Sequence, residues 1–306
     1  MGRKDEVLRL PSHGSISMNL SGCLTTTTIA FSKTLTEDSL LIDGAQEGKA
    51  SKRAFMHLDR IRAMARTDMY ARIESHNTFP RSTGLSSSSS GFAALTLAAT
   101  EALGMKLSKN ELSILARQGS GSACRSIPDG FCEWLDGDSS EASYAVSIFP
   151  PDHWKLCDVV AVVTTKPKEV ASSDTHRAVL ASPLYAARVA SMPALIKECK
   201  AHLAARDLGK LGPLIEQESD DLHALYESVG IFQRSPEALR ITRLARTWRR
   251  EFPVYYTLNT GQNVHLICEE QHVPDLKQKL AEIDDVRNVI VNEPARGARI
   301  SEVHLF

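Results

Sequence analysis

Hydrophobic and polar positions along the first third of the chain change period several times. Residues 15–20 alternate polar and apolar side chains, as in a strand with one buried face. Residues 25–31 are rich in threonine, and the stretch 40–44 ends in an Asp-Gly turn that favours a hairpin. From 51 to 66 the apolar side chains follow helical spacing, which predicts a helix with one buried face made by Phe55, Leu58, Ile61, Met64 and Ala65. We expect a short strand over 69–75.

The most pronounced change of pattern begins at residue 77. The polar segment NTFPRSTGLSSSSSG runs without a break into the apolar segment FAALTLAA. We therefore expect a buried helix over 92–103 that begins within or just after the serines. The loop before it offers hydroxyls and the unpaired N–H groups of a helix N-terminus, which bind anions, although it lacks the lysine-bearing GxxxxGK[ST] pattern. A serine-rich flexible linker is the alternative interpretation.

The rest of the chain shows a second periodic pattern. Ser108 and Glu111 form a capping box that opens a helix to about residue 117, and a strand is expected over 130–134. Farther on we expect strands at 157–165, 254–258, 264–268 and 286–291, and helices at 183–205, 208–227, 236–250 and 274–283. Pro183 is expected at the first position of its helix, with a kink at Pro193. This order is that of a ferredoxin-like βαββαβ unit with extra helices, so we place domains at 1–153 and 154–306.

Composition narrows the class of protein. The 306 residues are 42% hydrophobic and 24% charged, which is ordinary for a globular protein with one or two domains. The net charge of -1 and the lack of interleaved aromatic and basic residues argue against a nucleic-acid partner. No apolar run approaches the roughly 20 residues of a membrane span, and the polar start is not a signal peptide. Six scattered cysteines without CxxC pairs argue against zinc and for reduced thiols in a cytoplasmic protein.

Three segments together resemble one family. NTFPRSTGLSSSSSGFAAL is similar to the phosphate-binding loop of the GHMP small-molecule kinases, and GSGSACRS resembles the mark of their diphosphomevalonate decarboxylase branch, which includes phosphomevalonate decarboxylases. TLNTGQNV resembles that branch's third motif, usually TxDAGPN, and RKDEVLRLPSHGSISMNLSG and EVASSDTHR agree with it. The resemblance covers nearly the whole chain. It implies an α+β, two-domain GHMP kinase-like fold, with an N-terminal ribosomal-protein-like α/β domain and a C-terminal ferredoxin-like domain.

The resemblance also implies roles for individual residues. ATP would lie in the cleft between domains, on the hydroxyls and N–H groups of Ser86, Ser87, Ser88, Ser89, Ser90 and Gly91, with Mg²⁺ screening its charge and no protein metal ligand assigned. Arg125 would clamp the substrate carboxylate, because a guanidinium offers a planar pair of donors. The remaining substrate contacts would be Arg3, Arg53, Ser120, Gly121, Ser122 and Ser172.

Plainer interpretations of the same residues stay open. Arg125 as a surface arginine, Arg53 as a solvent-facing helix residue and Ser172 as a turn residue each explain their positions without a ligand. His223 aligns with a family histidine, which we interpret as a packed or capping residue. Trp134 and Trp154 are expected in the core.

The third motif departs from the family pattern at the catalytic position. The family carries an aspartate there as the base for the substrate 3-hydroxyl, and Asn259 is the aligned residue. An amide cannot accept a proton at neutral pH, and loss of a general base lowers a rate by about a hundred- to ten-thousand-fold. The chain could be an inactivated variant, a natural member that phosphorylates without decarboxylating or reacts slowly, or a member that has lost catalysis.

The start of the chain departs from the family as well. Members usually carry a lysine-tyrosine-tryptophan-glycine run there, and Met1 stands at the position of the tryptophan. We expect the first strand to be absent, which would expose a sheet edge. An upstream extension is then expected to raise solubility and the thermal midpoint.

The leading interpretation is an ATP-dependent carboxy-lyase of isoprenoid synthesis. It would convert mevalonate 5-diphosphate or 5-phosphate to an isopentenyl (di)phosphate by way of 3-hydroxyl phosphorylation, with an activity that Asn259 impairs. A mevalonate-type kinase that stops after phosphoryl transfer is the second interpretation, and a non-catalytic binding protein is the third. The resemblance further implies a homodimer, and nothing in the sequence indicates a membrane partner.

Overall fold

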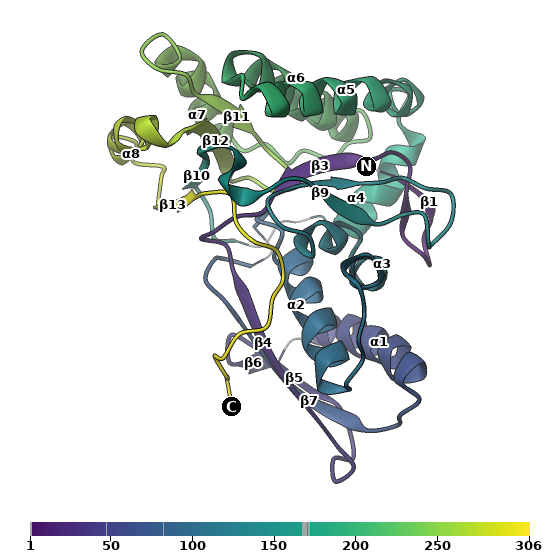
Figure 1. The fold of residues 1–306 in the computed structure, drawn as a ribbon. Coiled ribbons are helices and arrows are strands. Elements are labelled where there is room, and N and C mark those ends of the chain that lie inside the picture. The colour runs from purple at the N-terminus through teal and green to yellow at the C-terminus, as the bar shows by residue number, and fades with distance from the viewer. Residues whose placement is uncertain (1, 47, 82, 167–169, 171) are drawn as a thin grey trace.

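The chain folds into two groups of elements joined by a small central sheet (Figure 1). The computed structural model describes residues 2–46, 48–81, 83–166, 170 and 172–306, so Met1 lies outside the described residues. In the first half the strands are β1 (Arg3–Asp5), β2 (Leu10–Pro11), β3 (Ser15–Met18), β4 (Thr25–Ser32), β5 (Ser39–Ile42), β6 (Ala45–Gln46), β7 (Tyr70–Asn77), β8 (Phe131–Trp134) and β9 (Ala145–Phe149). The helices are α1 (Gly48–Ala65), α2 (Ser87–Ala102) and α3 (Lys109–Gly119), with 3-10 turns η1 (Gly121–Ser126) and η2 (Pro151–His153).

Helix α2 is the centre of the first half. It packs between the four-stranded sheet β4-β7-β5-β6 and helices α1 and α3 (Figure 1). It begins at the second serine of the run and buries Phe92, Leu95 and Leu97, which confirms the predicted junction. The capping box of α3 is also present, because Ser108 accepts from the Glu111 N–H and Glu111 accepts from the Ser108 N–H. Asp43 and Gly44 have positive φ between β5 and β6, as the predicted hairpin requires.

The second half contains the expected ferredoxin-like unit. Its strands are β10 (Leu156–Val162), β11 (Tyr255–Thr257), β12 (Val264–Glu269) and β13 (Asn288–Asn292). They form one antiparallel sheet in the order β11-β12-β10-β13. The helices are α4 (Ser172–Ala178), α5 (Tyr185–Ala205), α6 (Leu208–Glu227), α7 (Pro236–Trp248) and α8 (Val273–Ala281), with 3-10 turns η3 (Val179–Ala181) and η4 (Glu270–His272). Core residues on one face of the sheet pack against α7 and α8.

The two halves meet where the serine loop contacts the loop between β11 and β12. A Cβ added to Gly261 would lie 2.3 Å from the Gly84 Cα, so the two backbones touch in a way that only glycine allows. Asn263, which is 2% exposed, donates to the carbonyls of Thr83 and Thr164 and accepts from the N–H groups of Val163 and Thr164. This amide therefore ties the third motif to the serine loop.

Two sequence predictions were wrong in detail. Helix α5 begins at Tyr185 and not at Pro183, because the Ser182 hydroxyl accepts from the Leu184 N–H and holds the preceding residues in a turn. Met64 is 52% exposed although it was predicted on the buried face of α1, while Leu58 and Ile61 of that face are fully buried. Trp134 and Trp154 are buried as predicted.

No single helix among the described residues is both long and apolar enough to span a bilayer. Residues 174–181 and helix α5 reach that length and hydropathy only when added together, and the chain bends by 110° between them.

Candidate active site

A cavity of about 1240 Å³ lies where the two halves meet. Its walls come from β1, β3, β4, the serine loop, α2, η1, β10, α5, α6 and the β11–β12 loop. Nearly all the predicted site residues that the structure describes line it, namely Arg3, Arg53, Ser86, Ser87, Ser88, Ser89, Ser90, Ser120, Gly121, Ser122, Arg125 and Asn259. Gly91 is not among the lining residues. The side chain of Ser172 lies outside the described residues, and its backbone starts α4.

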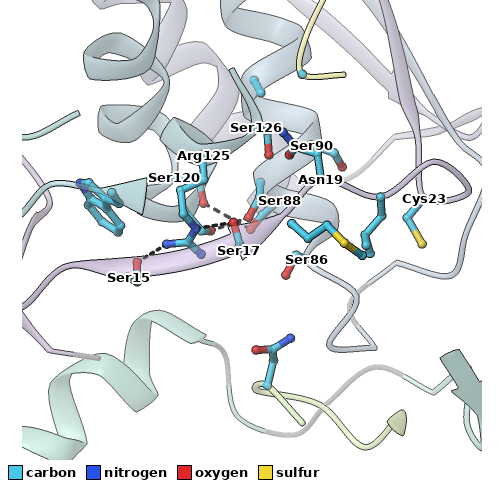
Figure 2. A pocket seen from close by; sticks show the side chains of 18 of the residues that line it. Ser15, Ser17, Asn19, Cys23, Ser86, Ser88, Ser90, Ser120, Arg125 and Ser126 are labelled. Atoms are coloured by element: carbon cyan, nitrogen blue, oxygen red, sulfur yellow. Dashed lines mark hydrogen bonds between the residues drawn. The ribbon is translucent and has the colours of Figure 1, made fainter. Parts of the chain in front are cut away.

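Arg125 is held by two serines of the strand that runs past it. Figure 2 shows its guanidinium between Ser15 and Ser17, with Nε donating to Ser17 Oγ at 2.8 Å and Nη1 donating to Ser15 Oγ at 2.5 Å. The Trp134 ring lies 5.8 Å from the Arg125 Cζ. Among the described residues Nη2 has no hydrogen-bond partner. The guanidinium is therefore oriented before any ligand arrives, and it keeps a donor for a carboxylate.

The backbone brings Arg125 to this place through a close helix contact. A Cβ at Gly119 would lie 2.3 Å from the Phe92 ring, so α3 ends against α2 only because residue 119 is glycine. The chain then turns at Ser120 into η1, which carries Arg125 in its last turn. The alternation of serines at 15 and 17 was visible in the sequence, but their role as partners of Arg125 was missed.

The serine run joins the same wall by hydroxyl contacts. Ser88 Oγ lies 3.3 Å from Ser120 Oγ (Figure 2), and the hydroxyls of Ser89 and Ser122 are hydrogen-bonded. Ser90 Oγ lies 2.6 Å from the Thr25 hydroxyl on β4. Ser86 adopts a left-handed backbone with φ of 61° immediately before α2. Predicted ATP residues and predicted substrate residues are thus in direct contact, beside the N-terminus of a long helix.

A group of arginines forms another end of the cavity. Arg53 donates through Nη2 to the Gly119 carbonyl at 3.2 Å and stacks over Phe92, and Arg3 pairs with Glu6 at 2.5 Å. Arg9, which the sequence analysis missed, donates through Nε to the Gln118 carbonyl at 3.0 Å. Burial, and then the charges of Arg3 and Arg53, lower the pKa of Arg9 to about 10. Desolvation by neighbouring atoms, and then the charge of Arg3, also lower the pKa of Arg53, although its side chain stays exposed to solvent. These crowded cations are suited to a multiply charged anion.

Asn259 stands at the end of β11 with an exposed side chain. Its amide makes no hydrogen bond to any residue that the structure describes, although it lines the cavity. Ser219 fixes the backbone just before it, by accepting from the Leu258 N–H at 2.9 Å. The position is thus well placed for a ligand contact, with an amide in place of a carboxylate.

His223 is fully buried and lies edge-on to Tyr226, with ring centroids 5.5 Å apart. Burial lowers its pKa to about 4, with Arg234 adding to the effect. It does not line the cavity. The structure therefore confirms the packed interpretation of this histidine.

Two ion pairs in the cavity wall, one half-buried and one buried, were also missed by sequence reasoning. Arg188 on α5 pairs with Glu218 on α6, and His265 on β12 pairs with Asp158 on β10. Burial alone would lower the pKa of His265, but the charge and hydrogen bond of Asp158 together raise it. Each pair joins residues far apart in the sequence, so no local motif marks it.

The donor set suits a metal ion that arrives with a nucleotide. Among the described residues no group of three or more His, Cys, Asp or Glu side chains could hold an ion. The carboxylates among the described lining residues are Asp158 and Glu218, and each already has a partner, His265 and Arg188 respectively. Serine hydroxyls of the 86–90 run are the available protein oxygens, so phosphates would supply most of the ligands of a Mg²⁺ ion.

Comparison with known proteins agrees with this geometry. Residues 1–145 match the diphosphomevalonate decarboxylase-like N-terminal domain, and residues 158–295 match the mevalonate 5-diphosphate decarboxylase C-terminal domain. The phosphomevalonate decarboxylase of Haloferax volcanii is 30% identical over 290 residues, covering 92% of this chain and 87% of that protein.

Solved structures are similar over almost the whole chain. The crystal structure of mevalonate diphosphate decarboxylase from Staphylococcus aureus has a TM-score of 0.91 and 33% identity, covering 97% of this chain and 92% of that one. A structure described as MDDEF in complex with MVAPP, AMPPCP and magnesium has a TM-score of 0.90 and 32% identity over the same shares. Because both domain models and these relatives match across both halves, the chain belongs to the diphosphomevalonate decarboxylase family.

Proposed function

We propose that the chain catalyses the ATP-dependent decarboxylation of a mevalonate 5-phosphate or 5-diphosphate to the corresponding isopentenyl ester. The observation that carries this proposal is one cavity that joins an oriented arginine, a helix N-terminus rich in hydroxyls and a group of crowded arginines. The oriented arginine suits a carboxylate, the helix N-terminus suits the phosphates of a nucleoside triphosphate, and the crowded arginines suit a phosphate ester. The family membership supports the same substrate class.

In this mechanism the serine run binds ATP. The backbone N–H groups at the start of α2 and the hydroxyls of Ser86 to Ser90 would hold the phosphates, with Gly91 behind them on the helix. Magnesium, held mainly by the phosphates, would neutralise charge on the transferred group. The 3-hydroxyl of the substrate is phosphorylated first, and loss of phosphate and CO2 then forms the double bond.

The substrate would be held at its two charged ends. Arg125 would bind the carboxylate, with Ser120, Gly121 and Ser122 beside it, and Arg3 and Arg53 would bind the ester phosphates together with Ser172 from the second domain. A fixed carboxylate keeps the bond to CO2 aligned with the departing 3-phosphate, which is what concerted loss of the two groups requires. Asn259 would orient the 3-hydroxyl by hydrogen bonding.

We further propose a domain boundary near residue 153, with domains at 1–153 and 154–306. The 3-10 turn η2 ends at His153, and β10, the first strand of the C-terminal sheet, begins at Leu156. Both bounds support this position. A cytoplasmic homodimer is proposed on the family resemblance, and all six cysteines have free thiols, as expected for a reducing compartment. Light scattering of the purified chain tests the dimer.

The test is a turnover assay with ATP, Mg²⁺ and each mevalonate ester, in which ADP and CO2 are measured separately. The unchanged chain and Asn259→Asp are compared side by side. Equal amounts of ADP and CO2 support the decarboxylase, and the ester that reacts identifies the substrate. ADP without CO2, from both chains, contradicts the decarboxylase and indicates a kinase, which Asn259 favours as the second candidate. Absence of ADP from both chains indicates a binding protein.

A further inference from the structure

The buried pair of His265 and Asp158 faces the same cavity as Asn259. The imidazole Nδ1 of His265 lies 2.8 Å from Asp158 Oδ2. His265 is 6% exposed and Asp158 is 4% exposed, and both line the cavity. In the strand register His265 lies opposite Val160 and Asp158 opposite Ile267, so the two side chains are diagonal neighbours on one face of the sheet.

The second imidazole nitrogen is free to act on a ligand. Among the described residues His265 Nε2 has no hydrogen-bond partner, and it is not one of the enclosed polar atoms that lack one. It therefore keeps some access to the cavity that this residue lines. Because Nδ1 is bonded to a carboxylate, the neutral ring carries its proton on Nδ1 and offers Nε2 as a proton acceptor.

The register also connects His265 with Asn259. Thr257 lies directly opposite His265 across β11 and β12, and opposite residues have Cβ atoms about 5 Å apart. Leu258 points into the hydrophobic core on the other face, while Thr257 and Asn259 both line the cavity. Thr257 therefore lies between Asn259, two residues farther along the chain, and His265, directly across the strand pair.

We propose that His265 accepts the proton of the phosphoryl-transfer step, in place of the carboxylate that position 259 lacks, and that Asp158 is its positioning residue. This inference rests on the proposed function. The substrate 3-oxygen forms a bond to the γ-phosphorus, while the bond from that phosphorus to the bridging oxygen breaks and ADP leaves. The proton of the 3-hydroxyl passes to the Thr257 oxygen as Thr257 gives its own proton to His265 Nε2.

The interaction between Asp158 and His265 predicts how kcat changes with pH. Asp158 raises the pKa of His265 against the effect of burial, and only the neutral ring accepts a proton, so kcat is expected to rise with pH through that pKa. Three thiols also interact with Asp158, namely Cys23, Cys157 and Cys268. Burial first, and then neighbouring negative charges that include Asp158, raise the pKa of each thiol, so all three stay neutral in this range. Removing the charge at position 158 is expected to move the acidic limb to lower pH.

The experiment measures ADP formation by His265→Gln, by the double variant His265→Gln with Asn259→Asp, and by Asp158→Asn across pH. His265→Gln is expected to lower kcat by about a hundredfold or more with little change in the KM for ATP. The double variant is expected to recover at least about tenfold, because a carboxylate at position 259 supplies a new base. His272→Gln on η4, outside the cavity, is the matched control and is expected to keep its activity.

Other outcomes overturn the inference. Unchanged kcat and pH profile in His265→Gln would exclude this residue as the acceptor. Loss of kcat that Asn259→Asp does not recover would make His265 a structural residue only. If Asp158→Asn lowers kcat at every pH without shifting its acidic limb, Asp158 is not the positioning residue of His265. Since ADP reports phosphoryl transfer alone, failure of the decarboxylase proposal appears separately, as ADP without CO2, and absence of ADP from the unchanged chain overturns both.

Discussion

The two cationic ends of the cavity are built on opposite principles. Arg125 is oriented by the hydroxyls of Ser15 and Ser17, which share its guanidinium donors without adding charge. Arg3, Arg9 and Arg53 are instead crowded together, and their mutual repulsion contributes to the lowered pKa of Arg9 and Arg53. One end is therefore prepared for a ligand of fixed geometry, and the other for a ligand of high charge. On the proposed function, the carboxylate would be recognised mainly by geometry and the phosphate ester mainly by charge.

The largest effect is expected at the oriented end. Arg125→Lys keeps the charge but loses the planar fork and both serine contacts. We expect kcat/KM to fall by about a thousandfold, since two charge-assisted hydrogen bonds are lost where the substrate is held. Steady-state kinetics with the reactive ester checks this. A loss in kcat/KM below tenfold would show that a positive charge alone is enough to hold the carboxylate. The contrast between the two ends of the cavity would then be wrong.

The contact between the two loops is expected to have the next largest effect. In Gly261→Ala the new Cβ would lie 2.3 Å from the Gly84 Cα, far inside van der Waals contact, so the serine loop and the third motif must separate. A displacement of about 1 Å typically lowers kcat by about a hundredfold, and circular dichroism should show a retained fold. Gly48→Ala, with open space around the new Cβ, is the control. Equal activity of the two variants would contradict a role for this contact.

Substitution of Arg9 in the crowded arginine group is expected to have smaller effects, with a gain in the stability of the free protein and a loss in its affinity for the ester. Arg9→Gln removes a cation whose pKa is lowered in the folded state, so the free protein should become slightly more stable at pH 7. The same change should raise the KM for the ester by about tenfold, because one charge-assisted contact to phosphate is lost. Thermal unfolding of the free protein measures the first effect, and steady-state kinetics with the ester measures the second. A lower midpoint in the free protein would mean that Arg9 is structural.

The smallest effect concerns the thiols beside Arg125. Cys124 and Cys132 lie near this cation, but burial outweighs its charge and raises the pKa of each thiol to about 12. We therefore expect a thiol reagent such as DTNB at pH 8 to leave both cysteines unmodified in the folded protein and to modify them after unfolding. Rapid modification of either thiol in the folded chain would show that Arg125 activates its surroundings electrostatically.

Local sequence was enough to predict the elements that carry the site. The junction of serines and apolar residues predicted α2, the Ser108 and Glu111 pair predicted the start of α3, and the order of elements predicted the second sheet. These signals work because helical periodicity, capping and hydrophobic runs depend on neighbours a few residues apart. Where a side chain changed the local geometry, as Ser182 does before α5, the predicted boundary was displaced.

Tertiary structure alone decided which polar groups meet. Ser15 and Ser17 are 110 and 108 residues from Arg125, and Asp158 is 107 residues from His265. Arg9 reaches the arginine group only because it contacts the end of α3, at Gln118. No periodicity or capping signal spans such separations. The chain therefore determined its helices, strands and family motifs by local chemistry, while packing determined the partners of its charges, because burial and register are set by the whole fold.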